Sequence, residues 1–269
     1  MEIRDFLREF QNRSGYDFCD YAAGSISRRL CKVSDEMGLT FEQILDRVAA
    51  DKELVNAVVE DITVNTTELF RDPQVWVAYG KALPRHLARQ AMSTLWHVGC
   101  STGLEVYSDL ILLEELGLAP RVRVIGTDIN QSVIDHAARG VYPYRFNRHY
   151  VDNFNAVMQG LGLRADFCKY FDIDECQDTM TVRAELRGRA RFLKQDLVRD
   201  RVPFAYRADV VFLRNVMIYF NEPLQARVLQ GVMEHMHDGA MLLMGRQEEL
   251  PASHRCHFVS QGCFYKKVR

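Results

Sequence analysis

The first 72 residues of the chain carry an apolar spacing that predicts helices and no strands. Along EIRDFLREFQNRSG, apolar residues recur at intervals of three and four up to Gly15, and DYAAGSISRRLCKVSDEMG ends at Gly38 in the same way. The stretch TFEQILDRVAADKELVNAVVEDI adds further amphipathic turns. We therefore expect residues 1–72 to form an all-helical N-terminal domain, followed by a linker and a helix over residues 73–92.

From residue 93 onward, short apolar runs alternate with amphipathic segments. The runs TLWHVG, RVRVIGTDI, ARFLKQDL, ADVVFLRN and AMLLMG are strand-like, whereas EVYSDLILLEELG, NQSVIDHAARG and EPLQARVLQGVMEHMHDG are helix-like. This alternation predicts an α/β domain with a parallel sheet and right-handed crossovers. The closing HRCHFVSQGCFYKKV divides at Gly262 into two strand-like halves, which predicts an antiparallel edge.

Residues 143–190 interrupt the alternation. A connection of that length rarely lacks structure of its own in a compact domain. Within it, TMTVRAEL alternates apolar and polar residues as a half-exposed strand does. The sequence therefore predicts a small inserted subdomain at about residues 143–190, inside an α/β domain that spans residues 93–269.

Composition and charge limit the classes of protein to which this chain can belong. The chain has 269 residues, is 48% hydrophobic and carries a formal net charge of −2, so it lacks the basic field that recruits nucleic acid or an anionic membrane. No apolar run approaches the roughly 18 residues of a membrane span, and the N-terminal residues lack a signal-peptide core. The seven cysteines are scattered and form no C-x-x-C pair. We expect a reduced, cytoplasmic monomer that neither binds nucleic acid nor inserts into a membrane.

Two histidine pairs raise the question of a metal site. His235 and His237 follow a helix-like run, where an imidazole suits the negative end of the helix dipole. His254 and His257 fit one face of a strand. Neither pair is accompanied by the Cys and His spacing of a zinc site, so we expect no metal.

A glycine turn joins the first predicted strand to its helix in the stretch HVGCSTGLEVYS. In open α/β sheets, ligands bind beyond the carboxyl ends of the strands. Gly99 and Gly103 would let the backbone approach such a ligand closely, and Glu105 would point into the same crevice. Asp128 closes the second strand, near the spacing at which an acid usually accepts both hydroxyl groups of a ribose. Each feature alone is explained by a tight turn or a helix cap, but together they indicate a nucleoside site.

The acidic turn distinguishes between nucleoside cofactors. A dinucleotide needs a G-x-G-x-x-G turn that leaves a helix N-terminus open to its pyrophosphate, whereas GCSTGLE places a glutamate there. A carboxylate repels a pyrophosphate and attracts a cation. S-adenosylmethionine has a ribose, no phosphate, a sulfonium and an ammonium group, so the sequence predicts this methyl donor rather than NAD or ATP.

Two later strands end in further candidate residues. Asp196, in KQDL, would accept a hydrogen bond from the amino group of adenine. Asn215 and Tyr219, in LRNVMIYF, would stand where the reacting groups meet. A plain buried strand is the alternative for LRNVMIYF, but burying its Arg and Asn unpaired would cost about 1–3 kcal/mol.

Four motifs, in this order, resemble those of the chemoreceptor glutamate methyltransferases, the CheR family, over nearly the whole chain. They are NTTELFRD at 65–72, CSTGLEVYS at 100–108, GTDIN with ARGVY within 126–142, and FLRNVMIYFN at 212–221. The closing MGRQEEL and the basic SRRLCK also resemble family segments. The resemblance implies a class I S-adenosylmethionine-dependent methyltransferase. Its fold is a Rossmann-like doubly wound sheet with an antiparallel C-terminal strand, preceded by a small all-α domain and carrying a small inserted β-subdomain.

The same resemblance implies a reaction and a set of site residues. Methyl groups would pass from S-adenosylmethionine to glutamate carboxylates in the cytoplasmic domain of a chemoreceptor, giving glutamate methyl esters and S-adenosylhomocysteine. The residues implied to surround the cofactor are Asn65, Thr67, Arg71, Glu105, Asp128, Asp196, Leu197, Asn215 and Val216. Arg71 and Tyr219 would lie nearest the transferred methyl group as catalytic residues. Arg28, Arg29 and Lys32 would face the acidic receptor, with a solvated helix face as the alternative.

Two other functions remain as alternatives. The first is an S-adenosylmethionine-dependent methyltransferase of another substrate, although the fourth strand ends in RNVMIY rather than the N/D-P-P-Y/F motif of amino-methylating nucleic-acid enzymes. The second is a regulator that senses the methyl donor without catalysis. The presence of both Arg71 and Tyr219 favours the enzyme.

Overall fold

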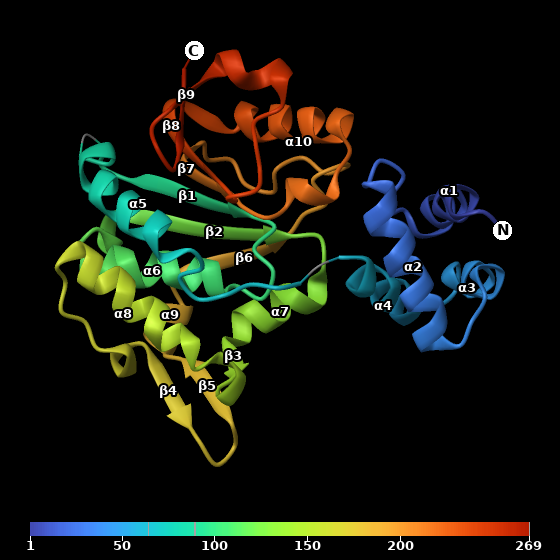
Figure 1. Ribbon diagram of the computed structural model, residues 1–269, viewed down its shortest axis with the longest axis horizontal. Coiled ribbons are helices and arrows are strands. Elements are labelled where there is room, and N and C mark those ends of the chain that lie inside the picture. Colours follow the sequence, from blue (N-terminus) through green and yellow to red (C-terminus); the bar gives the residue numbers. More distant parts are fainter. Residues whose placement is uncertain (64, 89, 269) are drawn as a thin grey trace.

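The computed structural model describes residues 1–63, 65–88 and 90–268. A bundle of four helices lies beside a larger body built on a twisted sheet, and the chain crosses from one to the other after the fourth helix (Figure 1). No helix within the described ranges is both long and apolar enough to cross a bilayer.

The N-terminal bundle follows the predicted helical pattern up to Ile62, whereas residues 65–72, which were expected in the same all-helical domain, form no helix. Its helices are α1 Ile3–Ser14, α2 Ala23–Met37, α3 Phe41–Val48 and α4 Lys52–Ile62. The first two end at Gly15 and Gly38, whose φ angles of 85° and 62° close the last turn in a conformation that favours glycine. Thr40 and Asp51 accept backbone N–H bonds at the starts of α3 and α4, which divides the last amphipathic stretch into two helices. The apolar faces of all four helices enclose a core of their own.

The larger body is built on one seven-stranded sheet in the order β6-β2-β1-β7-β8-β10-β9. The strands β6, β2, β1, β7 and β8 run parallel, and β10 is antiparallel to both β8 and β9. Their bounds are β1 Ser93–Val98, β2 Val122–Asp128, β6 Ala190–Lys194, β7 Ala208–Leu213, β8 Met236–Met244, β9 Phe258–Ser260 and β10 Tyr265–Lys267. This arrangement confirms the predicted doubly wound sheet with an antiparallel C-terminal edge.

Helices cover both faces of the sheet. They are α5 Pro73–His86, α6 Leu104–Glu115, α7 Gln131–Arg139 and α10 Glu222–Glu234. Successive side chains of a strand point to opposite faces, so Leu95 packs with α5 and α6, whereas Trp96 and Val98 pack with α10. The carboxyl ends of β1, β2, β6 and β7 remain uncovered by these helices and face the N-terminal bundle (Figure 1).

The inserted segment contains a small antiparallel sheet and one long helix. The sheet has the order β3-β5-β4, with β3 Val141–Pro143, β4 Phe171–Asp174 and β5 Thr179–Val182. Helix α8, His149–Leu161, packs against α5. The prediction that all of TMTVRAEL forms a strand is wrong, because α9, Ala184–Arg187, follows β5 directly. Ala, Glu, Leu and Arg are strong helix formers, and this propensity prevails once the ladder of β5 ends.

The two histidine pairs lie at separate ends of the C-terminal segment. His235 follows the last residue of α10 as predicted, and its ring bonds the carbonyl of Gly231. The helix-like run was expected to continue to Gly239, but β8 begins at Met236 and contains His237. His254 and His257 belong to the 3₁₀ helix Ala252–His257, so the predicted strand is wrong there. Pro251 precedes this helix, and its carbonyl accepts the backbone N–H of His254 to close the first turn. Among the described residues, no group of three or more His, Cys, Asp or Glu side chains is arranged to hold a metal ion.

Candidate active site

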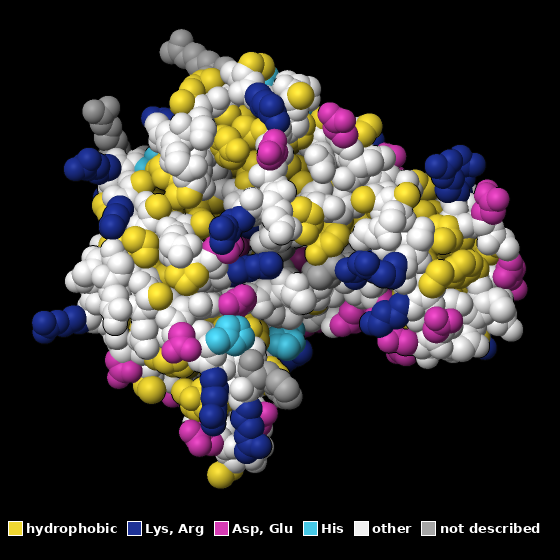
Figure 2. All heavy atoms as spheres, viewed as in Figure 1, with side chains coloured by type: hydrophobic (Ala, Val, Ile, Leu, Met, Phe, Trp, Pro, Cys, Tyr) yellow, Lys and Arg dark blue, Asp and Glu magenta, His cyan; other side chains and the backbone are white. Residues whose placement is uncertain are grey.

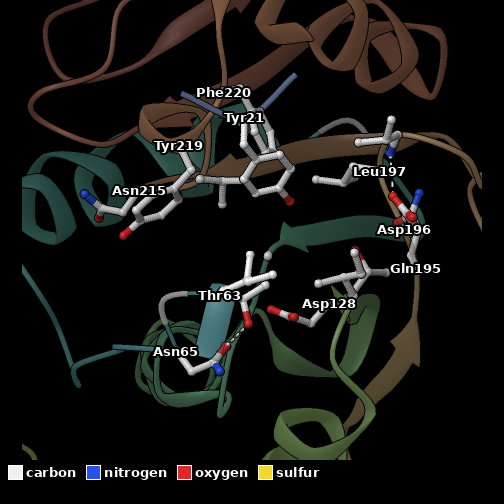
Figure 3. A pocket seen from close by; sticks show the side chains of 16 residues that line it. Tyr21, Thr63, Asn65, Asp128, Gln195, Asp196, Leu197, Asn215, Tyr219 and Phe220 are labelled. Carbon is white, nitrogen blue, oxygen red and sulfur yellow. Dashed lines mark hydrogen bonds between the residues drawn. The ribbon is translucent and has the colours of Figure 1, made fainter. Parts of the chain in front are cut away.

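A deep pocket lies between the open edge of the sheet and the N-terminal bundle. Tyr21, Ile62, Thr63 and Asn65 form its wall on the bundle side. The opposite wall consists of residues that follow the strands: Gly99, Thr127, Asp128, Ile129, Gln195, Asp196, Leu197, Val198, Asn215, Val216, Tyr219 and Phe220. In Figure 3, Asn215 and Tyr219 lie at one end of this pocket, and Asp196 and Leu197 lie at the other.

A second, charged pocket adjoins the first. The residues that line it are Thr66, Thr67, Glu68, Arg71, Gly99, Cys100, Ser101, Glu105, Arg214 and Asn215. Gly99 and Asn215 line both pockets, so the two spaces are neighbours along one cleft. The structure thus brings together all but one of the residues that the sequence nominated for the cofactor.

The exception is Gly103. Its φ of 87° closes the turn before α6, and a Cβ there would lie 2.8 Å from the Cβ of Ala137 and 3.2 Å from the ring of Phe192. The missing side chain therefore makes room for α7 and β6, and Gly103 is not among the residues that line either pocket. Gly99 does line the cleft, although a Cβ at its position would strike a methyl group of Val216 at 2.5 Å.

Asp128 ends β2 inside the deep pocket. One carboxylate oxygen accepts the backbone N–H of Ser101 at 2.8 Å, and the other accepts that of Asn130 at 3.1 Å. Burial raises the pKa of Asp128, while these backbone hydrogen bonds act in the opposite direction. The carboxylate is thereby oriented by two loops at once and points into the pocket (Figure 3).

The opposite end of the deep pocket holds a second buried carboxylate. Asp196 accepts the backbone N–H of Val198 at 2.8 Å, and burial raises its pKa. Beside it, Oε1 of Gln195 is buried and has no hydrogen-bond partner among the described residues. This end therefore offers hydrogen-bond acceptors next to the apolar side chains of Leu197 and Val198.

Glu105 lies at the centre of a charge network that the sequence did not reveal. Its Oε1 is 3.2 Å from Nδ1 of His97, and its Oε2 accepts from Nη1 of Arg214 at 2.9 Å. Arg214 also donates to Asp72 at 2.8 Å. The sequence indicated an acid that points into the crevice, and the structure places its carboxylate between an imidazole and a guanidinium. Polar residues inside the apolar runs TLWHVG and VVFLRN were the available signal.

Glu248 is a second residue that sequence reasoning missed. Its carboxylate accepts four backbone N–H groups, from Gly245, Asn215, Val216 and Met217, at 2.6–2.9 Å. Asn215 has a φ of 61°, a conformation that is uncommon for a residue with a side chain. The buried carboxylate therefore holds the loop after β7 in the shape that lines both pockets. The sequence signal for Glu248 was the resemblance of MGRQEEL to a family segment, which assigned no role to either of its two acids.

Replacing Glu248 with glutamine should lower the free energy of unfolding by about 2–3 kcal/mol, because an amide NH₂ would face backbone donors that now share a carboxylate. We expect a fall in Tm of roughly 5–10 °C by calorimetry. Glu249→Gln is the matched control, since Glu249 is 81% exposed and pairs with Arg255 at the surface. Equal thermal stability of the two variants would contradict this role for Glu248.

Tyr219 lies where the bundle meets the deep pocket. The guanidinium of Arg29 is 5.7 Å from the centre of its ring, and the Tyr219 carbonyl accepts the backbone N–H of Ala22 at 2.8 Å. Burial raises the pKa of Tyr219, although the charges of Arg29 and Arg71 act against that rise. Tyr219 is therefore a protonated hydrogen-bond donor at neutral pH.

The three basic residues nominated to face a receptor have different surroundings. All three lie on α2, but Arg29 is partly buried against Tyr219 and the Asp61 carbonyl. Arg28 is exposed, and Lys32 forms a surface ion pair with Glu36 at 3.3 Å. Only Arg28 and Lys32 thus present their charge to solvent.

The chemistry of the cleft fits S-adenosylmethionine. Of the described residues that line the deep pocket, none is Lys or Arg, and two are carboxylates, which suits a nucleoside and not a diphosphate. The buried Gln195 Oε1 and Ser101 Oγ have no hydrogen-bond partner within the described chain, so both are available to bind a ligand. The charged pocket offers a guanidinium and a carboxylate, Arg71 and Glu105, for a zwitterionic amino acid.

Comparison with known proteins agrees with this fit. The family model described as "CheR methyltransferase, SAM binding domain" matches residues 65–264. The Pseudomonas putida protein Cher3, named as a methyltransferase, is 32% identical over 254 residues, which cover 94% of this chain and 90% of the relative. A chemotaxis protein methyltransferase of Vibrio parahaemolyticus is 29% identical over 93% of this chain and 89% of the relative. The chain therefore belongs to the CheR methyltransferase family, and it is a methyltransferase of class I fold that uses S-adenosylmethionine.

Proposed function

We propose that this enzyme methylates glutamate side chains of a chemoreceptor, giving glutamate methyl esters and S-adenosylhomocysteine. The observation that best supports this proposal is that Arg71 and Tyr219 line neighbouring pockets, which share Gly99 and Asn215. A guanidinium and a protonated phenol can hold a carboxylate, and neither needs to act as a base. Similar bacterial proteins are named chemotaxis protein methyltransferases, which supports a substrate that takes part in chemotaxis.

The cleft suggests how the cofactor would be held. In the deep pocket, Asp128 would accept the ribose hydroxyl groups and Asp196 the amino group of adenine, between the side chains of Leu197 and Val216. In the charged pocket, Glu105 would bind the ammonium of the methionine portion, with Thr67 and Arg71 beside it. Asn65 would close the site from the linker.

The proposed reaction requires no general acid or base from the protein. The cofactor supplies an electrophilic methyl group on a sulfonium. A glutamate side chain has an unperturbed pKa of about 4.3, so its oxygen can form the C–O bond as the C–S bond breaks, and no proton is transferred. The residues must orient the carboxylate and exclude water, and orientation alone can supply roughly 7–11 kcal/mol. Arg71 and Tyr219 are placed to do this.

The test is to incubate the full chain with methyl-labelled donor and the cytoplasmic part of a candidate receptor. Label that is retained on the receptor and released by mild base identifies a glutamate ester. A receptor fragment with glutamine in place of the candidate glutamates is the matched control. Base-stable label would identify another methylated substrate, and donor binding without transfer to any receptor would identify a sensor. Either result would overturn the proposal, which places the enzyme in the cytoplasm with its substrate.

Arg28 is exposed on α2, and we expect it to help attract an acidic receptor. Figure 2 shows Lys and Arg side chains beside the hollow between the bundle and the larger body. Arg28→Glu should raise the KM for the receptor severalfold at low salt, and the difference should shrink as salt screens charges beyond about 8 Å. Arg4→Glu, an exposed cation on α1, is the control. Equal KM values in the two variants would favour a merely solvated face.

A further inference from the structure

Behind Glu105 lies a buried histidine that the proposed reaction does not use. His97, on β1, has no exposed surface and stacks on Phe212 with ring centres 4.2 Å apart. Its Nδ1 is 3.2 Å from Oε1 of Glu105, and its Nε2 is 3.0 Å from Oδ2 of Asp109. The other oxygen of Asp109 accepts from the hydroxyl of Tyr79 at 3.1 Å. One imidazole thus joins a pocket-lining carboxylate to a fully buried one.

The geometry assigns a protonation state to His97. An ionised carboxylate can only accept hydrogen bonds, so between two ionised carboxylates both ring nitrogens must donate, and only the imidazolium has two N–H groups. Burial raises the pKa of Asp109, and the hydrogen bonds from His97 and Tyr79 act against that rise. Burial by itself would lower the pKa of His97, but the hydrogen bonds and charges of Asp109 and Glu105 outweigh it and raise the pKa. Phe212, which stacks on the ring, cannot titrate, and the hydroxyl of Tyr79 donates to Asp109.

The network also balances charge. Asp72, Glu105 and Asp109 are joined through hydrogen bonds to the cations of Arg214 and His97. Arg246, which is 69% exposed, pairs with Asp72 at 3.7 Å from the solvent side. With His97 protonated, the five less exposed side chains of this network together carry one net negative charge. A single cationic group of a ligand at Glu105 neutralises it, whereas a neutral imidazole would leave two negative charges in a largely buried space.

We propose that His97 is a positioning residue, whose imidazolium, anchored by Asp109, fixes the Glu105 carboxylate for the ammonium of the methyl donor. Arg214 restrains one oxygen of Glu105 and His97 restrains the other, so the carboxylate cannot turn away from the pocket. The inference rests on the proposed placement of the methionine portion at Glu105. It assigns His97 no contact with the donor or with the transferred methyl group.

Two isosteric substitutions of His97 distinguish a role in positioning Glu105 from a role in packing the core. The amide nitrogen of Asn matches the place of Nδ1 and that of Gln matches the place of Nε2. His97→Asn therefore keeps a donor for Glu105, and His97→Gln keeps one only for Asp109. Calorimetry on the full chain would compare S-adenosylhomocysteine, which has the ammonium group, with methylthioadenosine, which lacks the amino-acid portion.

We expect His97→Gln to bind S-adenosylhomocysteine about tenfold more weakly, or about 1.4 kcal/mol, and His97→Asn to lose less than threefold. Methylthioadenosine should bind the wild-type protein and both variants with the same affinity. Equal losses in both variants, or parallel losses for both ligands, would mean a structural role and overturn the inference.

Two further measurements keep the inference testable if the variants fold poorly. Glu105→Gln should weaken the binding of S-adenosylhomocysteine and leave the binding of methylthioadenosine unchanged. Any other result would contradict the proposed placement of the methionine portion at Glu105, independently of the role of His97. In the wild-type protein without ligand, ¹⁵N NMR should show both ring nitrogens of His97 protonated at neutral pH. A neutral tautomer in that spectrum would refute the assigned state of His97 directly.

Discussion

Replacing Arg71 with alanine should lower kcat for methyl transfer by roughly two to three orders of magnitude, the usual cost of removing one charged group that orients a reaction. The fold should survive, because the contacts that tie Arg71 to its surroundings are made by its backbone. Its carbonyl accepts from the indole of Trp76 at 3.1 Å and from Arg214 at 3.3 Å, and alanine keeps both. Kinetics at saturating donor and receptor, with Tm measured in parallel, would test this.

Two variants sharpen the test of Arg71. Arg71→Lys keeps the charge but loses the planar fork of donors, so it should recover only part of the activity. Arg246→Ala is the matched control, since Arg246 is 69% exposed and lies 3.7 Å from Asp72 at the rim of the same site. Wild-type turnover in Arg71→Ala would remove Arg71 from the mechanism.

Replacing Asp128 with alanine should weaken binding of S-adenosylhomocysteine by roughly a hundredfold to ten-thousandfold. Two hydrogen bonds from ribose hydroxyls to a charged carboxylate are worth about 1.5–3 kcal/mol each, and both would be lost. Calorimetry would measure the affinity, and it should fall for methylthioadenosine as well, because that ligand also contains the ribose. This pattern differs from the one expected at His97.

Asp128 also accepts two backbone N–H groups, so its removal could act through the loops. Asp128→Asn keeps the shape and one acceptor, and it should lie between wild type and alanine in affinity. Asp135→Ala, an exposed acid on α7, controls for the general loss of a carboxylate. An unchanged affinity in Asp128→Ala would undo the ribose assignment.

The sequence predicted elements well where the signal was local. Gly15 and Gly38 end their helices, and the apolar runs before Gly99 and up to Asp128 form neighbouring strands, because spacing and glycine conformation act over a few residues. The same locality explains the errors. TMTVRAEL changes from strand to helix where the cross-strand ladder ends, and the ladder depends on residues elsewhere in the chain.

The candidate site was predicted as a list of residues, but not as a network. Arg214 pairs with Asp72 and Glu105, which are 142 and 109 positions away, and Glu248 holds a loop that begins at Asn215. Such partners are set by the strand order β2-β1-β7-β8, which no local pattern encodes. For Gly103, the sequence correctly indicated a tight turn but could not show that α7 and β6 occupy the space beside it.

The antiparallel bridge between Tyr21 and Phe220 joins segments that lie far apart in the chain. Backbone bonds on both sides of it, Ala22 to Tyr219 and Asn221 to Asp20, make this a short two-stranded seam. Without the bundle, the deep pocket would keep only the wall formed by residues that follow the strands. The helical bundle therefore supplies one wall of the deep pocket that we propose for the cofactor, and α2, with the basic side chains that we expect to meet the receptor, begins directly after that seam.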